Sequence, residues 1–147
     1  MEIKLTPYLR KAQFYETDQA GIIHHANYVH WMEEARADMM DQMGYGYQRV
    51  AELGIHFVLF SIGCQYKSMV RFGETVRVLS TLSELNPLLM TVTYRMFDEP
   101  GGILRATAES RHCAYDIRQQ RPARLDMALP ELYETLKRHH IQTPPAK

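Results

Sequence analysis

Cysteine is scarce in this sequence of 147 residues, which holds only Cys64 and Cys113. Two thiols are too few for the disulfide framework on which small secreted domains depend. Each cysteine falls within a run of residues typical of a β-strand. We therefore expect buried or half-buried free thiols, and a location in the cytoplasm.

Long apolar runs are also missing. No stretch approaches the roughly 18 consecutive apolar residues that a membrane-spanning helix needs, so we expect no membrane span. The opening residues Met1-Glu2-Ile3-Lys4 lead directly into mixed polar sequence, which is not the pattern of a signal peptide.

Neither sign of charge is in excess, because Lys plus Arg and Asp plus Glu both number 17. A domain without net charge is poorly suited to bind nucleic acid through its overall field. We expect no nucleic-acid partner, although a local basic cluster can still bind a small phosphorylated ligand.

Length and composition predict a single folded domain. Hydrophobic residues make up 46% of the sequence and charged residues 23%, which is ordinary for a globular protein with a core. Neither an internal repeat nor a linker interrupts the chain. We expect one domain over residues 1–141 and a flexible tail over residues 142–147.

One long helix is predicted in the first third of the chain. Asn27 is the expected N-cap of a helix that begins at Tyr28. Apolar residues then recur at steps of three or four, which is the spacing of one helix face. They are Tyr28, Met32, Ala35, Met39 and Met43, with Trp31 beside them. Gly44 and Gly46 end the helix, and residues 48–53 add one more turn.

Beyond Gly54 the apolar period changes to two, which predicts β-strands. The first of these strands has apolar residues at alternate positions, which places them on one face: Val58, Phe60, Ile62, Cys64 and Tyr66. The expected strands, including one before the helix, cover residues 9–17, 58–67, 76–82, 88–96 and 103–115. A closing helix is expected over residues 128–139.

The order of these elements predicts an α+β fold. Short turns between successive strands favour antiparallel neighbours. A long sheet with one apolar face must cover that face, and the methionine-rich helix is the available cover. We expect a curved antiparallel β-sheet wrapped around one central α-helix.

The segment from Phe14 to Arg36 carries the residues most suited to chemistry. Asp18 stands at a tight Asp-Gln-Ala-Gly turn, and His25 follows seven residues later, just before the helix. A helix N-terminus offers unpaired backbone N–H groups and partial positive charge, which suit a carbonyl oxygen that becomes an oxyanion. A nearby carboxylate can attack that carbonyl or take a proton from water. The arrangement favours acyl-group chemistry.

The run D-x-x-G-x-x-x-H-x-x-Y over residues 18–28, followed by E-E-A-R at residues 33–36, resembles the 4-hydroxybenzoyl-CoA thioesterase family of hotdog-fold proteins. It is most similar to the Tol-Pal-associated acyl-CoA thioesterase branch, which has a histidine where His25 stands. The motif segment covers 23 residues, 14–36, and the order of elements agrees over roughly the first 120.

The resemblance implies a hotdog fold and hydrolysis of an acyl-CoA thioester to a free acid and CoA. Asp18 matches the family's catalytic nucleophile or general base. His25 matches the catalytic position whose backbone N–H helps to polarise the thioester carbonyl, and Gly21 matches the glycine of the tight turn. Tyr28 and Glu34 match helix positions that we interpret as mainly structural.

The resemblance also implies a homodimer or homotetramer, with sites at dimer interfaces. CoA is part of the substrate, and neither a metal nor another cofactor is needed. His24 departs from the family pattern, where an aromatic residue is more usual. We assign substrate binding to residues around the turn and the helix start, and to one basic residue: Gly21, His24, Asn27, Tyr28 and Arg71.

Simpler interpretations stand beside these assignments. The simpler interpretation of Asp18 is a turn aspartate that only accepts backbone hydrogen bonds. The spacing of His24, His25 and His30 matches no standard zinc pattern, so we expect no metal site. Several other residues allow two interpretations each.

Five basic residues are either contacts for CoA phosphates or ordinary solvated charges. They are Lys67, Arg71, Arg118, Arg121 and Arg124. Tyr45 and Tyr47 either line an acyl pocket or close the end of the sheet. Glu33 and Arg36 are expected to form a surface or interface pair three residues apart.

Two other functions remain open. One is a dehydratase of the same fold that acts on acyl carriers, although such enzymes place their histidine and acid on different elements. The other is an acyl-CoA-binding protein without catalytic activity, for which the loss of Asp18 would matter little. Fold alone excludes neither function.

Overall fold

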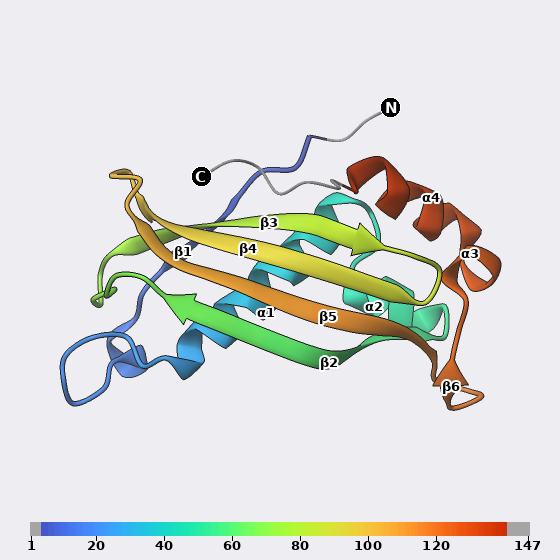
Figure 1. Ribbon diagram of the computed structural model, residues 1–147, viewed down its shortest axis with the longest axis horizontal. Coiled ribbons are helices and arrows are strands. Elements are labelled where there is room, and N and C mark those ends of the chain that lie inside the picture. Colours follow the sequence, from blue (N-terminus) through green and yellow to red (C-terminus); the bar gives the residue numbers. More distant parts are fainter. Residues whose placement is uncertain (1–3, 141–147) are drawn as a thin grey trace.

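The computed structural model describes residues 4–140 of the chain (Figure 1). In chain order, the elements are β1 (Tyr8–Lys11), the 3-10 helix η1 (Phe14–Glu16), α1 (Ala26–Gln42), α2 (Tyr47–Glu52), β2 (Ile55–Tyr66), β3 (Thr75–Leu85), β4 (Leu89–Glu99), β5 (Leu104–Asp116), β6 (Arg121–Pro122), α3 (Leu125–Ala128) and α4 (Pro130–His139).

The strands form one antiparallel sheet in the order β1-β3-β4-β5-β2, with the short β6 paired to β5. The sheet is curved, and α1 lies across one of its faces (Figure 1). This arrangement confirms the predicted α+β architecture. Among residues 4–140, strand β2 pairs only with β5, so its other side is an open edge of the sheet.

The core lies between α1 and the sheet. Six residues of α1 are buried at helical spacing: Tyr28, Trp31, Met32, Ala35, Met39 and Met40. Alternating side chains of the sheet face them, such as Val76 and Val78 on β3 and Val92 on β4. Burial of each large apolar side chain contributes about 1.5–3 kcal/mol, so this helix face holds the domain together.

The start of α1 differs from the prediction. The helix begins at Ala26 with His25 as its N-cap, whereas Asn27 lies in the first turn. The Asn27 side-chain amide donates to the backbone oxygens of Glu16 and His24, at 2.8 and 3.3 Å. Asn27 therefore satisfies carbonyl groups of the preceding segment and does not cap the helix.

The first strand is shorter than the expected range of residues 9–17. It ends at Lys11, because Ala12 pairs instead with the turn before β3, through its N–H to Glu74 and its carbonyl to Gly73. The chain then turns into η1, which buries Glu16 and exposes Phe14.

A β-bulge in β2 overturns the prediction of a single apolar face. The register shifts between Leu59 and Ser61, so Val58 lies opposite Cys113 whereas Ile62 lies opposite Ser110. Cys113 and Ser110 are three positions apart on β5 and point to opposite faces of the sheet. The five expected apolar residues of β2 are thus divided between both faces.

The C-terminal part of the described chain forms two helices where one was expected. Helix α4 begins with Pro130 at its first position, where the missing N–H is tolerated. Leu132 and Leu136 of this helix are fully buried. The expected tail over residues 142–147 lies outside the described residues. No helix within residues 4–140 is long and apolar enough to cross a membrane. Cys64 and Cys113 are half-buried free thiols.

Candidate active site

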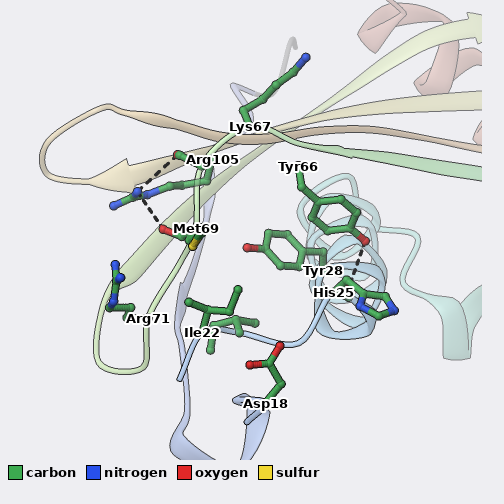
Figure 2. Close-up of a pocket in the computed structure, with 11 residues that line it drawn as sticks. Asp18, Ile22, His25, Tyr28, Tyr66, Lys67, Met69, Arg71 and Arg105 are labelled. Atoms are coloured by element: carbon green, nitrogen blue, oxygen red, sulfur yellow. Dashed lines mark hydrogen bonds between the residues drawn. The ribbon is translucent and has the colours of Figure 1, made fainter. Parts of the chain in front are cut away.

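A pocket of about 620 Å³ opens at the N-terminal end of α1 (Figure 2). Its walls come from the loop before α1, the first turns of α1, the end of β2, the loop between β2 and β3, and β5. The lining residues are Asp18, Ile22, Ile23, His25, Tyr28, Tyr66, Lys67, Ser68, Met69, Arg71 and Arg105.

Asp18 is held by its own turn. Its N–H donates to the carbonyl of Ile22 at 2.9 Å, and its Oδ1 accepts from the N–H of Ala20 at 2.8 Å. Gly21 closes the turn with a φ of 79°, a conformation that favours glycine. The second carboxylate oxygen of Asp18 forms no hydrogen bond with any described residue. Asp18 is therefore both a turn residue and a carboxylate available to a ligand.

The helix start supplies the second polar element of the pocket. The N–H groups of Ala26, Asn27 and Tyr28 donate to His24 Nδ1, the His24 carbonyl and the His25 carbonyl. The backbone N–H of His25 forms no hydrogen bond with another described residue. A free N–H at a helix N-terminus, where the helix dipole is positive, is suited to stabilise a developing oxyanion.

Two tyrosines form the wall between α1 and β2. The rings of Tyr28 and Tyr66 meet edge to face with centroids 4.8 Å apart. The Tyr66 hydroxyl donates to the His25 carbonyl at 2.9 Å. Burial raises the pKa of Tyr66 to about 12 and also raises the pKa of Tyr28. Both phenols are thus neutral hydrogen-bond donors at physiological pH.

Three basic residues line one side of the pocket. Arg105 is fixed by hydrogen bonds to Met69 and Ser68 and by ion pairs to Glu74 and Asp98. The side-chain ammonium of Lys67 donates only to Gln65 among the described residues. Arg71 is exposed and forms no ion pair with a described residue. Lys67 and Arg71 are therefore available to an anionic ligand.

The structure brings together four of the seven residues singled out from the sequence. Asp18, His25, Tyr28 and Arg71 line the pocket, and Figure 2 shows the Asp18 carboxylate and the Tyr28 hydroxyl pointing toward the same space. The other three, Gly21, His24 and Asn27, lie outside the lining. His24 is exposed, and its ring stacks on that of His25 with centroids 4.1 Å apart.

The expected pair of Glu33 and Arg36 does not form. Arg36 instead donates to the hydroxyls of Tyr47 and Tyr94, and these form a buried polar chain with Ser110. A guanidinium that leaves the surface needs hydrogen-bond acceptors around it, and the tyrosine hydroxyl oxygens supply them. Tyr47 therefore packs against the core and does not line the Asp18 pocket.

Two of the arginines considered as contacts for CoA phosphates lie far from the Asp18 pocket. Arg121 and Arg124 line a separate pocket beside β6. That strand lies at the opposite end of the sheet from the loop before α1 (Figure 1). Neither arginine can contact a ligand held wholly within the Asp18 pocket. Within the described residues, no group of three or more His, Cys, Asp and Glu side chains is placed to hold a metal ion.

Sequence reasoning missed Tyr66, Ile22 and Met69 as members of the pocket. The alternating pattern predicts that Tyr66 lies in a strand, but nothing in the sequence indicates that the end of β2 lies beside the start of α1. That proximity depends on the long-range pairing of β2 with β5.

Comparison with known proteins gives a family match over most of the chain. Residues 12–136 match the family model described as the thioesterase-like superfamily. A Bacillus subtilis (strain 168) protein, YneP, whose name gives acyl-CoA thioesterase as a provisional activity, is 30% identical over 131 residues. The alignment covers 87% of this chain and 94% of YneP.

Two solved structures share the fold closely. The hypothetical protein TT1821 from Thermus thermophilus has a TM-score of 0.85 and 32% sequence identity, covering 92% of this chain and 100% of its own. A DHNA-CoA thioesterase from Staphylococcus aureus also has a TM-score of 0.85, with 27% identity, covering 90% of this chain and 88% of its own. The expected hotdog fold is confirmed.

Proposed function

Because this chain belongs to the thioesterase-like superfamily, we propose that it is an acyl-CoA thioesterase, which hydrolyses an acyl-CoA thioester to a free acid and CoA. One observation carries the proposal: Asp18 and His25, whose backbone N–H forms no hydrogen bond with another described residue, line the same pocket. The activities named for YneP and for the S. aureus relative support the same reaction.

In this mechanism the thioester carbonyl lies at the N-terminus of α1. Its oxygen accepts a hydrogen bond from the His25 N–H, and the helix dipole stabilises the negative charge that develops there. Asp18 either attacks the carbonyl carbon or takes a proton from an attacking water. The carbon–sulfur bond then breaks, and CoA leaves as a thiolate that takes a proton from water.

The two roles of Asp18 differ in one measurable intermediate. Direct attack forms an acyl anhydride, so the mass of the intact chain rises by one acyl group after rapid quenching and returns after hydrolysis. General-base catalysis leaves the mass of the chain unchanged throughout turnover.

We assign the remaining sequence-predicted residues as follows. His25 and Tyr28 contact the substrate from α1, Gly21 shapes the Asp18 turn, and Arg71 contacts a CoA phosphate. His24 and Asn27 belong to the segment that carries these groups. CoA enters only as part of the substrate, and we propose neither a separate cofactor nor a metal.

The motif over residues 18–28 supports a finer placement in the 4-hydroxybenzoyl-CoA thioesterase family, nearest its Tol-Pal-associated branch. The cytoplasmic location stays a prediction.

We also propose a homodimer or homotetramer that forms through the open edge of β2. This edge strand carries large exposed apolar residues, among them Val58, Phe60 and Ile62 at 45, 51 and 41% exposure. An edge strand of this length, with apolar side chains and one side that pairs with no described strand, is a template for pairing with another copy.

The test is thiol release from a panel of acyl-CoAs that includes short aliphatic, long aliphatic and aromatic acyl groups. Turnover of one or more thioesters supports the thioesterase and identifies its acyl class. Binding of acyl-CoA without thiol release would instead indicate a binding protein. Hydration of an enoyl thioester, without thiol release, would indicate a dehydratase.

A further inference from the structure

Glu16 is a buried acid two residues before Asp18. It is 2% exposed, although its neighbours Phe14 and Tyr15 are 73 and 76% exposed. Acidic side chains are almost never buried to this extent unless donors surround them. The Glu16 side chain therefore points into the protein, where a specific set of donors must surround its carboxylate.

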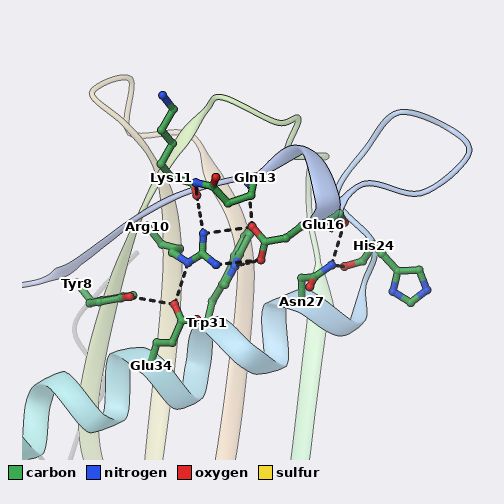
Figure 3. A network of polar contacts seen from close by, with 9 residues as sticks. All are labelled: Tyr8, Arg10, Lys11, Gln13, Glu16, His24, Asn27, Trp31 and Glu34. Atoms are coloured by element: carbon green, nitrogen blue, oxygen red, sulfur yellow. Dashed lines mark hydrogen bonds and ion pairs between the residues drawn. The ribbon is translucent and has the colours of Figure 1, made fainter.

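Those contacts come from three parts of the chain (Figure 3). Oε1 of Glu16 accepts from the N–H of Gln13 at 2.8 Å, and Oε2 accepts from the indole N–H of Trp31 at 2.9 Å. The guanidinium of Arg10 contacts both oxygens, each at 3.2 Å. Glu16 thus joins β1, η1 and α1 through charge-assisted hydrogen bonds.

The backbone of Glu16 holds the far side of the same loop. Its carbonyl accepts from the N–H of His24 and from the side-chain amide of Asn27, both at 2.8 Å. The next residue, Thr17, bridges to Ile23. Residues on both sides of the Asp18 turn are therefore fixed to one buried residue.

We propose that Glu16, held by Arg10 and Trp31, is the positioning residue that sets Asp18 against the N–H of His25. This inference rests on the proposed thioesterase function. The hydrogen bonds of the Asp18 turn run within the loop before α1, and a displacement of about 1 Å in a reacting group reduces rates on the order of 10²-fold. Glu16 supplies the rigid connection to α1 that the turn lacks.

The chain offers a matched control in Glu34. Its carboxylate accepts from the same Arg10 side chain and from the Tyr8 hydroxyl, each at 2.9 Å. It joins α1 to β1 as Glu16 does, but it contacts no residue of the loop before α1. Loss of Glu34 therefore reports the structural effect of breaking the network without the positioning effect.

The experiment compares Glu16→Gln, Trp31→Phe and Glu34→Gln in the full chain. The rates are measured under conditions where the same fraction of each variant is folded. We expect Glu16→Gln to lower kcat by about 10-fold or more, with KM changed by less than about 3-fold. Trp31→Phe keeps an aromatic ring in the core and removes the donor, so it should lower kcat by roughly 3- to 10-fold even if Glu16→Gln fails to fold. Glu34→Gln should keep kcat within about 3-fold of the native value.

Amide hydrogen exchange over residues 17–25 is the second readout, and it does not depend on activity. Exchange should be faster in Glu16→Gln and Trp31→Phe than in Glu34→Gln. Unchanged kcat and unchanged exchange in the first two variants, or an equal loss of kcat in Glu34→Gln, would overturn the positioning role. If the native protein releases no thiol from any acyl-CoA, the proposed function fails, whereas the exchange result still decides whether Glu16 holds the loop.

Discussion

The hydroxyl of Tyr66 donates a hydrogen bond to the backbone carbonyl of His25 across 2.9 Å, which joins the end of β2 to the N-terminus of α1. The two residues are 41 positions apart in the chain. This contact brings the end of the edge strand to the helix N-terminus, so that Tyr66 lines the same pocket as Asp18 and His25.

Tyr66→Phe removes that hydroxyl and keeps the ring that packs on Tyr28. We expect kcat/KM to fall roughly 3- to 10-fold, because a neutral hydrogen bond contributes about 1 kcal/mol. Since burial raises the pKa of Tyr66 to about 12, the phenol stays protonated and the ratio of native to variant rates should be constant between about pH 6 and 9. A ratio that changes with pH in this range would show that another group responds to the substitution.

The burial of His112 leads to a prediction of how the stability of the fold depends on pH. Burial, together with the nearby positive charge of Arg36, lowers its pKa to about 4, so the folded protein holds this histidine neutral. The unfolded chain takes up a proton near pH 6.5. Stability is therefore fully present above about pH 6.5 and is lost as the pH falls toward 4, by on the order of 3 kcal/mol.

Denaturant unfolding at pH 7 and pH 4.5 measures this loss. His112→Gln should be less stable at pH 7, because it loses the hydrogen bond between His112 Nε2 and the Ser110 hydroxyl at 2.8 Å. Its stability should nevertheless fall less than that of the native protein as the pH decreases. His56→Gln, at an exposed position on β2, is the matched control and should behave as the native protein does. If the stability of His112→Gln and that of the native chain depend on pH in the same way, His112 is not the cause of the loss of stability at low pH.

Much of the fold follows from residue patterns, because helix and strand periods are local. The spacing of Met32, Ala35 and Met39 predicts α1, and the turns predict antiparallel strands. The bulge at Phe60 is not predictable in this way, because it depends on the register of β2 against β5. For the same reason the sequence pattern wrongly places all five apolar residues of β2 on one face of the sheet.

The site is predictable only where its residues are close in sequence. Asp18, Gly21, His25 and Tyr28 fall in one motif, but Tyr66 enters the pocket through long-range strand pairing. Arg36 shows that residues close in sequence can also be paired wrongly. The helical spacing predicts an ion pair with Glu33, whereas the guanidinium donates hydrogen bonds to the tyrosines of α2 and β4.

Arg71 tests how the substrate is held. Arg71→Gln should raise KM by about 10-fold and leave kcat nearly unchanged, because a phosphate contact binds ground state and transition state alike. Arg121→Gln, at the opposite end of the sheet, should change neither constant. Steady-state kinetics at low and moderate salt measures both, and an unchanged KM for Arg71→Gln would show that CoA phosphates bind elsewhere.

The open edge of β2 predicts the oligomer. Phe60→Lys places a charge at the centre of the exposed edge, so we expect the native dimer or tetramer to dissociate, as measured by light scattering after size-exclusion chromatography. Met127→Lys, at an apolar position that is 75% exposed on α3, is the control and should keep the native mass. A native protein that elutes as a monomer would contradict assembly through this edge.

Asp18→Asn tests the central claim most directly. The amide keeps the shape of the turn and an acceptor for the N–H of Ala20, but it neither attacks a thioester nor takes a proton from water. The measurement is thiol release from the best acyl-CoA of the panel, with melting temperature and CoA affinity determined for the same samples. We predict a loss in kcat on the order of 10²-fold or more with both of those values retained. A variant that is folded, binds CoA and releases thiol as fast as the native protein would show that Asp18 is not the catalyst.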